Sequence, residues 1–195
     1  MKTIKKVITI LMIICITLSL CPVSVSAKSP KKEIQKQTQG LFKAAKKYDI
    51  SKVKKYCAPG SSVLHIKDKH FQKYIKKGNK KYFDAEIKKI SVKKDTATVT
   101  VRITNLSGWN IADNAISEYY RSLDFSTQNF ENCIDSYYEL ALEDPTDDDV
   151  SSYTFKLKYK KINNKWLISK INSGFLEMLD GGFAERLEQF SKTAK

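Results

Sequence analysis

Few side chains in this sequence have the chemistry of a metal ligand or an acid–base catalyst. The 195-residue chain contains two histidines, His65 and His70. A helix would turn side chains five positions apart away from each other, and neither histidine belongs to a Cys- or His-rich ligand pattern. We therefore expect both histidines at the surface or in loops, and we predict no metal site and no cofactor.

Two carboxylates, Asp84 and Glu86, lie in a segment that alternates like a strand. Enzymes place a general acid or base where burial shifts its pKa. Asp84 and Glu86 share the strand face opposite Phe83, Ala85 and Ile87, so we expect both to face solvent. The sequence also lacks a Gly-rich phosphate loop and the local motifs of serine and cysteine hydrolases. We assign no catalytic residue, and we favour a non-enzymatic role while leaving catalysis open.

An acidic loop supplies a second group of oxygen ligands. It contains Asp144, Asp147, Asp148 and Asp149. Calcium prefers such carboxylates, but this spacing lacks the glycine and the terminal glutamate of a calcium-binding loop. We interpret the segment as a solvated acidic turn.

Two cysteines, Cys57 and Cys133, follow the N-terminal apolar segment. In an oxidising compartment they would form one disulfide. Alternatively, they remain two buried thiols that pack as small hydrophobic side chains. Two cysteines are too few to define a disulfide framework, so the sequence leaves both alternatives open.

Basic residues are unevenly distributed along the chain. Residues 28–94 contain 21 Lys and Arg against five Asp and Glu, residues 95–150 contain two against 12, and residues 151–195 contain nine against four. Lys156, Lys158 and Lys160 alternate with hydrophobic residues, which predicts a basic ridge on the solvent face of one strand. A surface of this kind attracts anionic polymers or lipid headgroups.

The first 27 residues have the layout of a cleaved secretory signal peptide. Three lysines precede an apolar run from Val7 to Cys21, and Val25-Ser26-Ala27 supplies small residues at a cleavage site. We therefore predict a secreted protein that is associated with the cell envelope. Export makes nucleic acid an unexpected partner in spite of the basic charge.

Two alternatives to a released protein stay open. The stretch from Val7 to Val25 is nearly long enough for an uncleaved N-terminal anchor. A lipid on Cys21 would also tether the protein to the membrane. The large Leu20 before Cys21 disfavours the lipid, because lipid-attachment signals place a small residue there.

The hydrophobic spacing predicts one α+β domain over residues 34–191, after a disordered lead-in over 28–33. Apolar residues recur every three or four positions in the expected helices and every second position in the expected strands. The expected helices cover about 32–48, a short segment after Asp49 or Ser51, a segment from Asp68 to Gly78, two helices within an insertion over about 109–143, and a C-terminal helix broken at Gly181-Gly182. The expected strands cover 82–92 with a bulge near Lys88-Lys89, 96–104, 153–160 and 166–171, with a tight turn at Asn163-Asn164. A curved four-stranded antiparallel sheet, packed on helices on one face, accommodates this order.

Four segments have a form that occurs together in one superfamily. Residues 41–53 contain an opening helix and the turn into a second helix, and 97–105 form a long alternating strand. Residues 164–168 are a hairpin return with Asn164 in place of a usual glycine, and 175–183 end in Gly-Gly-aromatic. The chain thus resembles the nuclear-transport-factor-2-like (cystatin-like) superfamily, in particular its exported or lipoprotein-like members from Gram-positive bacteria. The resemblance implies a cone-like fold with a cavity between sheet and helices, and it implies fold more than function.

We therefore expect an exported, non-enzymatic binding or accessory domain. Its partner would be a small apolar ligand, a cell-wall polyanion, the membrane surface or an envelope protein. One alternative is an isomerase or dehydratase that uses the cone cavity, which requires an inward carboxylate or histidine. The other is a protein-interaction module built on the acidic helical pair, which requires an exposed apolar patch within 109–143. The oligomeric state is left open.

Overall fold

The computed structural model describes residues 29–193. Within them the chain forms seven helices and four strands, which confirms the predicted α+β class. The predicted signal peptide and Cys21 lie outside the described residues. Among residues 29–193, none of the helices combines the length and the apolar character that crossing a bilayer requires. The elements are α2 (Pro30–Lys46), α3 (Ile50–Lys54), α4 (Lys69–Tyr82), β1 (Asp84–Lys93), β2 (Thr96–Leu106), α5 (Gly108–Ser122), α6 (Thr127–Glu143), β3 (Val150–Ile162), β4 (Lys165–Lys170), α7 (Ser173–Asp180) and α8 (Phe183–Thr193).

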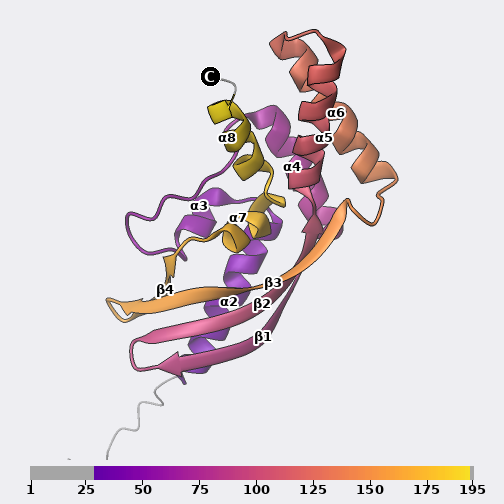
Figure 1. Ribbon diagram of the computed structural model, residues 1–195. Coiled ribbons are helices and arrows are strands. Elements are labelled where there is room, and N and C mark those ends of the chain that lie inside the picture. Colours follow the sequence, from indigo (N-terminus) through magenta and orange to yellow (C-terminus); the bar gives the residue numbers. More distant parts are fainter. Residues whose placement is uncertain (1–28, 194–195) are drawn as a thin grey trace, which may run out of the picture.

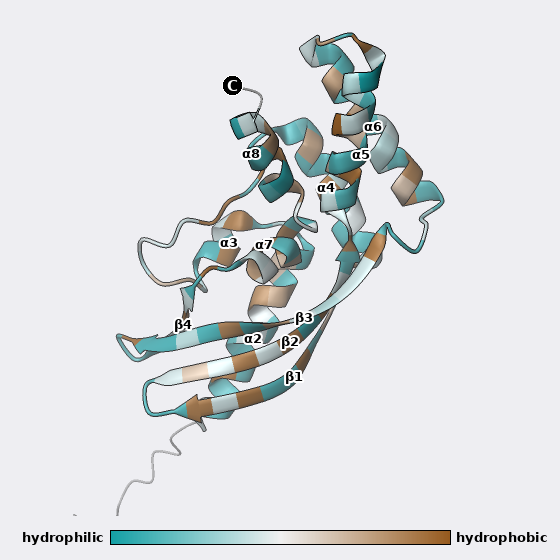
Figure 2. Ribbon diagram, in the orientation of Figure 1, coloured by the Kyte–Doolittle hydropathy of each residue, from teal (hydrophilic) through white to brown (hydrophobic). Residues whose placement is uncertain are grey.

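The four strands form one antiparallel sheet in the order β1-β2-β3-β4 (Figure 1). Hydrophobic and polar residues alternate along the strands, as Figure 2 shows. Every second side chain of β2 from Ala97 to Ile103 is buried, so one face of the sheet contributes to the core. The register shifts between Ile87 and Lys89, which confirms the predicted bulge. Asn163-Asn164 adopts left-handed backbone at both residues and closes the β3–β4 hairpin, also as predicted.

Helix α2 crosses the inner face of the sheet. Figure 1 shows it behind the strands, and Thr38 on α2 shares a 2.9 Å hydrogen bond with Tyr159 on β3. Ile34 and Leu41 on the same helix are fully buried. The helix begins at Pro30, because the fixed φ of proline suits a first helical turn. Residues 30–33 therefore belong to α2, and our prediction of a disordered lead-in over this segment was wrong.

The two edges of the sheet differ. The segment after α3 covers β4: the Ile168 N–H donates to the Tyr56 carbonyl, and the Ala58 N–H donates to the Ile168 carbonyl, both at 2.8 Å. Within residues 29–193, no strand pairs with the outer edge of β1. The sheet thus has one covered edge and one open edge in the part of the chain that the structure describes.

Helix α4 continues through Gly78, where the sequence predicted that it would stop, and ends at Tyr82. A Cβ on Gly78 would lie 3.0 Å from the Leu106 side chain at the end of β2. The glycine therefore allows close contact between α4 and β2 rather than forming a turn. Because the helix is longer than predicted, β1 begins at Asp84 instead of Tyr82.

Helices α5 and α6 form a helical pair that extends beyond one end of the sheet (Figure 1). Helix α4 supports this pair through two polar contacts. His70 Nε2 lies 2.7 Å from Asp135 Oδ1, and the Tyr74 hydroxyl donates to Glu139 Oε1 at 3.1 Å. The Tyr74 ring also stacks on Tyr138, with ring centroids 5.3 Å apart. These contacts fix the direction in which the helical pair projects.

The beginning of the helical pair meets the α7–α8 turn in direct backbone contact. The Trp109 N–H donates to the Gly181 carbonyl at 2.8 Å. A Cβ on Gly181 would overlap the Leu106 carbonyl oxygen, and a Cβ on Gly108 would overlap the Asp180 carbonyl oxygen. Gly181 also has a φ of 65°, which favours glycine. We call this contact the glycine junction.

Two buried asparagines lie beside the glycine junction. Asn79 Nδ2 donates to the Ala45 carbonyl at 3.0 Å and to the Leu179 carbonyl at 2.7 Å. Asn105 Nδ2 donates to Asn79 Oδ1 at 3.1 Å. These bonds join α2, α4, β2 and α7, so buried polar groups at the centre of the fold find partners.

Replacing Gly181 by alanine tests the glycine junction. We expect Gly181→Ala to lower the free energy of unfolding by about 3 kcal/mol or more, because the new Cβ meets backbone atoms in an unfavourable φ region. Gly60→Ala is the matched control, since Gly60 also has positive φ (79°) but a Cβ there meets nothing within 4 Å. We expect that change to cost about 1 kcal/mol. Urea denaturation of both variants measures the difference, and equal losses would contradict the packing.

Candidate functional site

The outer face of the sheet carries three rows of lysine and hydroxyl side chains, which we call the lysine face. Strand pairing places Lys89, Thr100 and Lys156 in the first row, Ser91, Thr98, Lys158 and Lys170 in the second, and Lys93, Thr96 and Lys160 in the third. Successive rows lie about 7 Å apart along the strands, and β1 lies about 10 Å from β3. The predicted ridge on β3 is therefore the centre of a regular grid of six lysines.

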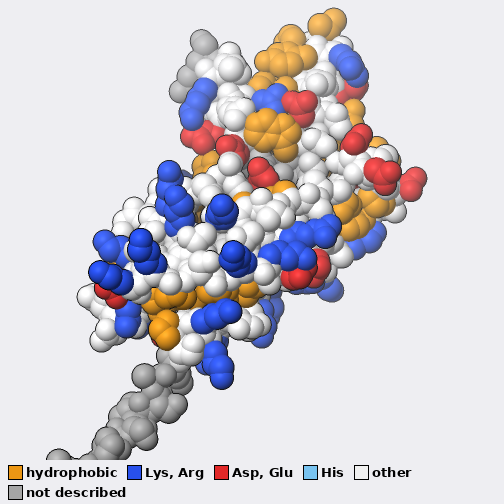
Figure 3. Space-filling model, turned by 60° about the horizontal axis from the view of Figure 1, so that its bottom comes forward, with side chains coloured by type: hydrophobic (Ala, Val, Ile, Leu, Met, Phe, Trp, Pro, Cys, Tyr) orange, Lys and Arg blue, Asp and Glu red, His pale blue; other side chains and the backbone are white. Residues whose placement is uncertain are grey.

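The lysine face has an excess of positive charge. All six lysines are exposed, and the three rows contain no acidic residue. Among residues 29–193, none of the six forms an ion pair. Figure 3 shows lysine and arginine side chains spread over the sheet-bearing part of the molecule, whereas several acidic side chains lie over the helical pair. An anion that approaches these rows would meet six lysines, none of which is paired with a carboxylate of the described residues.

Sequence reasoning located half of the lysine face. It identified Lys156, Lys158 and Lys160 from the alternation of β3, but it did not include Lys89 and Lys93 on β1 or Lys170 on β4. The bulge between Ile87 and Lys89 reverses the phase of β1. Following the alternation past the bulge would have placed Lys89 and Lys93 on the outer face.

The two strand carboxylates are exposed, as predicted. Asp84 and Glu86 both face solvent on β1, and Glu86 forms an ion pair with Lys88. Glu86 lies opposite Arg102 in the next row of the sheet. These carboxylates lie outside the three lysine rows and have no buried environment that would prepare them for acid–base chemistry.

The buried carboxylate of the described residues is Asp180, which the sequence analysis did not single out. It lies at the end of α7 and is 4% exposed. The Tyr48 hydroxyl donates to Asp180 Oδ2 across 3.4 Å, while Oδ1 has no hydrogen-bond partner. Burial raises the pKa of Asp180 to about 7, although backbone N–H groups at the start of α8 act in the opposite direction. The sequence offered one signal for this residue, since Asp180 directly precedes the Gly181-Gly182 turn.

Little space remains around Asp180. A pocket lined by Asp180, Asn79 and Tyr138 has a volume of about 10 Å³. That volume is close to the minimum for a single water molecule. The side chains of the core therefore fill this part of the interior, and no substrate fits beside the carboxylate in this conformation.

The histidines do not come together. His70 contacts Asp135 on the helical pair, whereas His65 Nδ1 lies 2.7 Å from the Val63 carbonyl in the loop before α4. Among the described residues, no group of His, Cys, Asp and Glu side chains is arranged to hold a metal ion. Both histidines have structural contacts that account for their positions.

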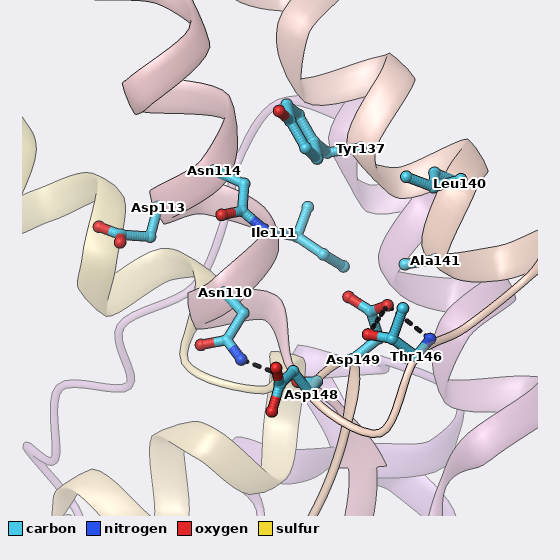
Figure 4. Close-up of a pocket in the computed structure, with 10 residues that line it drawn as sticks. All are labelled: Asn110, Ile111, Asp113, Asn114, Tyr137, Leu140, Ala141, Thr146, Asp148 and Asp149. Atoms are coloured by element: carbon cyan, nitrogen blue, oxygen red, sulfur yellow. Dashed lines mark hydrogen bonds between the residues drawn. The ribbon is translucent and has the colours of Figure 1, made fainter.

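A surface pocket of about 270 Å³ lies between the helical pair and the acidic loop (Figure 4). Two of its carboxylates already have partners. Asp149 Oδ2 accepts from the Thr146 N–H at 2.8 Å, and Asp113 Oδ1 accepts from Arg186 on α8 at 2.6 Å. The acidic loop thus uses a carboxylate to stabilise its own turn, in line with our interpretation of a solvated acidic turn.

Cys57 and Cys133 are free thiols in the structure, and both are buried. The backbone of Cys57 forms an isolated parallel β-bridge with Ile168 on β4, whereas Cys133 lies on α6. Burial raises the pKa of Cys57 to about 11, so its thiolate is rare at neutral pH. The structure corresponds to the second of the two alternatives, packed thiols rather than a disulfide.

Comparison with known proteins adds no identification. No family model, no curated protein and no solved structure matches the chain. The class that the described residues define is an α+β domain with a four-stranded antiparallel sheet. Its function must be inferred from its own surfaces and interior.

The ionisation of Asp180 predicts a pH dependence of stability. Its pKa in the folded protein, about 7, lies above the ordinary aspartate value of 3.8, so the folded state binds this proton more tightly than the unfolded state does. The associated stability is fully present below about pH 4 and is lost as the pH rises to about 7. Asp180→Asn keeps the shape of the side chain without its charge. As the pH rises from about 4 to about 7, we expect the free energy of unfolding of this variant to increase by on the order of 3 kcal/mol relative to that of the wild type.

Urea denaturation of wild type and Asp180→Asn at several pH values measures this gain. Taking the difference between the two proteins removes the contribution of other titrating groups. Glu86→Gln serves as the control, because Glu86 is exposed. A constant difference between wild type and Asp180→Asn across the pH range would show that Asp180 titrates normally.

Thiol chemistry tests the state of the cysteines. We expect protein that lacks residues 1–27 to show two reactive thiols toward a colorimetric thiol reagent in denaturant, and to react slowly when folded because Cys57 and Cys133 are buried. Electrophoretic mobility should be the same with and without reductant. Absence of reactive thiols in the denatured, unreduced protein would show that the two cysteines are joined.

Proposed function

We propose that this protein is an exported, non-enzymatic binding domain of the cell envelope that holds an anionic cell-wall polymer on its lysine face. The observation that carries the proposal is the grid of six exposed lysines on β1, β3 and β4, which has no ion-pair partner within residues 29–193. A folded protein that keeps so many like charges on one face loses stability through their mutual repulsion. An anionic partner would remove that repulsion.

The arrangement of the lysine face favours a polymer over a single small anion. The lysines repeat at about 7 Å along β3 and are not gathered around a recess. Each lysine is a flexible point charge with three donors, so it suits a partner whose charges also repeat. Thr98 and Thr100 lie between the lysine columns and add hydroxyl groups to the same face. Phosphate groups along a wall polymer have the matching chemistry.

Helix α2 offers a second basic surface on the other side of the sheet. Lys32, Lys36 and Lys43 line an open groove of about 760 Å³ together with Glu33 and Tyr56. The groove contains a carboxylate, whereas the lysine rows contain none. Its lysines therefore give the natural comparison for a binding experiment.

The resemblance to the nuclear-transport-factor-2-like superfamily belongs to the same proposal. The α2 helix across the inner face and the curved antiparallel sheet support a cone-like arrangement of the kind the superfamily has. In that superfamily the ligand site is the interior of the cone. Here Tyr48, Tyr138 and Asp180 fill the interior that the sequence analysis assigned to a small apolar ligand. That filling favours the outer face over the interior as the binding surface.

One observation favours the enzymatic alternative. Asp180 is an inward carboxylate with a pKa near neutrality, as a general acid or base requires. The volume beside it, about 10 Å³, is far smaller than ligand pockets, which measure hundreds of cubic ångströms. Catalysis there would require the core to open, so we place this function second.

Binding of purified cell-wall polyanion to matched lysine variants tests the proposed function. We expect Lys156→Gln with Lys158→Gln to weaken binding about tenfold or more and to lower the salt dependence by roughly one to two units in the slope of log K against log salt. Lys36→Gln with Lys43→Gln removes the same charge from α2 and should change both quantities much less. Affinity is measured by calorimetry at several salt concentrations.

Two results would contradict the proposal. Equal losses in both pairs of variants would indicate attraction to net charge rather than to the lysine face. Binding that does not change with salt would exclude an electrostatic interface altogether.

A further inference from the structure

The tip of the helical pair exposes large hydrophobic side chains. Tyr120, Leu123 and Phe125 are 50%, 78% and 59% exposed, and all three lie where α5 ends and α6 is about to begin. Leu140 and Val92 are the remaining large hydrophobic residues with high exposure among residues 29–193. We call Tyr120, Leu123 and Phe125 the apolar tip. This is the exposed apolar patch that a protein-interaction surface on the helical pair requires.

Hydrogen bonds hold the apolar tip in one conformation. The Tyr119 hydroxyl donates to the Phe125 carbonyl at 2.8 Å, and Asn129 Nδ2 donates to the Asp124 carbonyl at 2.6 Å. Leu123 adopts left-handed backbone, with a φ of 56°, which is unfavourable for a leucine. The loop therefore presents Leu123 and Phe125 to solvent in a fixed geometry. A pre-organised surface loses less entropy when it binds.

The rim of the apolar tip is acidic. Within the described part of the chain, Asp124 and Glu131 are the unpaired acidic residues of this turn and of the first turns of α6, while Glu118 on α5 forms an ion pair with Arg121. The whole segment 95–150 contains 12 acidic residues and two basic ones. Anionic lipid would be repelled by this rim, so the expected partner is a basic protein surface with an apolar centre.

The open edge of the sheet in this same chain has that composition. The inward side chains of β1 are only partly covered: Ile87 and Ile90 are half-buried, and Val92 is 39% exposed. Lys89, Lys93 and Lys94, which form no ion pair among residues 29–193, belong to the same strand and its turn, while Lys88 pairs with Glu86. Figure 3, which brings this side of the molecule forward, shows a stripe of hydrophobic side chains with lysines on both sides. We call Ile87, Ile90 and Val92 together the β1 seam.

We propose that the apolar tip of one molecule binds the β1 seam of a second copy of the same chain. Figure 1 shows β1 and the tip at opposite ends of the molecule, so the two surfaces cannot meet within one copy. Each surface is apolar at its centre, and the rims have opposite charge. Contact between unlike surfaces is head-to-tail, so it leaves a free tip and a free seam at the two ends of every complex.

The size of the surfaces sets the strength of the contact. Three side chains on each partner bury less area than the roughly 1,200 Å² of a stable interface. Association is therefore weak and dependent on concentration and salt. It gains strength where copies are held close together, as along a polymer bound to the lysine face.

Sedimentation velocity of complementary variants tests this proposal. Leu123→Ser with Phe125→Ser removes the tip, and Val92→Asp places a negative charge in the seam. At low ionic strength we expect the wild type to show a sedimentation coefficient that rises with concentration, and each variant alone to remain a monomer. Mixing the two variants should restore association, but only as a 1:1 complex, because one intact tip meets one intact seam.

Leu140→Ser is the matched control, since Leu140 is 57% exposed on the same helical pair but lies away from the tip. This variant should associate like the wild type, and circular dichroism should show that all variants keep their fold. A wild type that stays monomeric up to millimolar concentration at low ionic strength would overturn the proposal. So would continued self-association of Val92→Asp alone, because it would show that tips pair with tips. Neither result depends on whether the lysine face binds a polyanion.

Discussion

The glycine junction fixes how the helical pair is attached to the sheet. There the end of β2, the start of α5 and the α7–α8 turn approach so closely that Gly108 and Gly181 have no room for a side chain. The same insertion is closed at its base, where the Ser107 N–H donates to the Asp149 carbonyl at 2.7 Å. Asn79 and Asn105 supply the adjoining buried hydrogen bonds. The two ends of the insertion are thus bonded to each other beside the sheet, and its start is bonded to the α7–α8 turn.

This attachment separates two kinds of surface. The sheet and α2 carry many of the lysines, while the helical pair and its loop carry most of the carboxylates. A rigid connection keeps the two regions apart and prevents them from neutralising each other within one molecule. The lysine face therefore remains available to anions, and the apolar tip remains available to other basic surfaces. Both proposals follow from the same division of charge.

The sequence predicted the regular parts of the fold well. The alternation of β2 and β3, the bulge in β1 and the turn at Asn163-Asn164 all follow from local periodicity and turn chemistry. The prediction failed at Gly78 and at the lead-in, because a glycine can serve close packing as well as a turn and a proline can begin a helix. The role of Gly78 is not visible without the neighbouring β2, whereas a proline in the first helical turn is a signal that the sequence itself carries.

The sites were less predictable than the strands. The lysines on β3 were found because they lie on one strand, but Lys89 and Lys170 join them only through cross-strand register. Asp180 was missed because its burial results from contacts with Tyr48, which is far away in the sequence. The sequence analysis stated only that a protein-interaction module would need an exposed apolar patch within 109–143. It did not name Leu123 and Phe125, because their exposure depends on how the helical pair projects.

The central claim is that an anionic polymer lies on the outer face of the sheet. Mapping of backbone amide NMR shifts during titration with a short phosphate polymer tests it most directly. The account predicts saturable shifts concentrated on Thr98, Thr100 and Lys156–Lys160, with little change on α2 or the helical pair. Shifts concentrated on α2, or small shifts spread over every lysine of the chain, would contradict it.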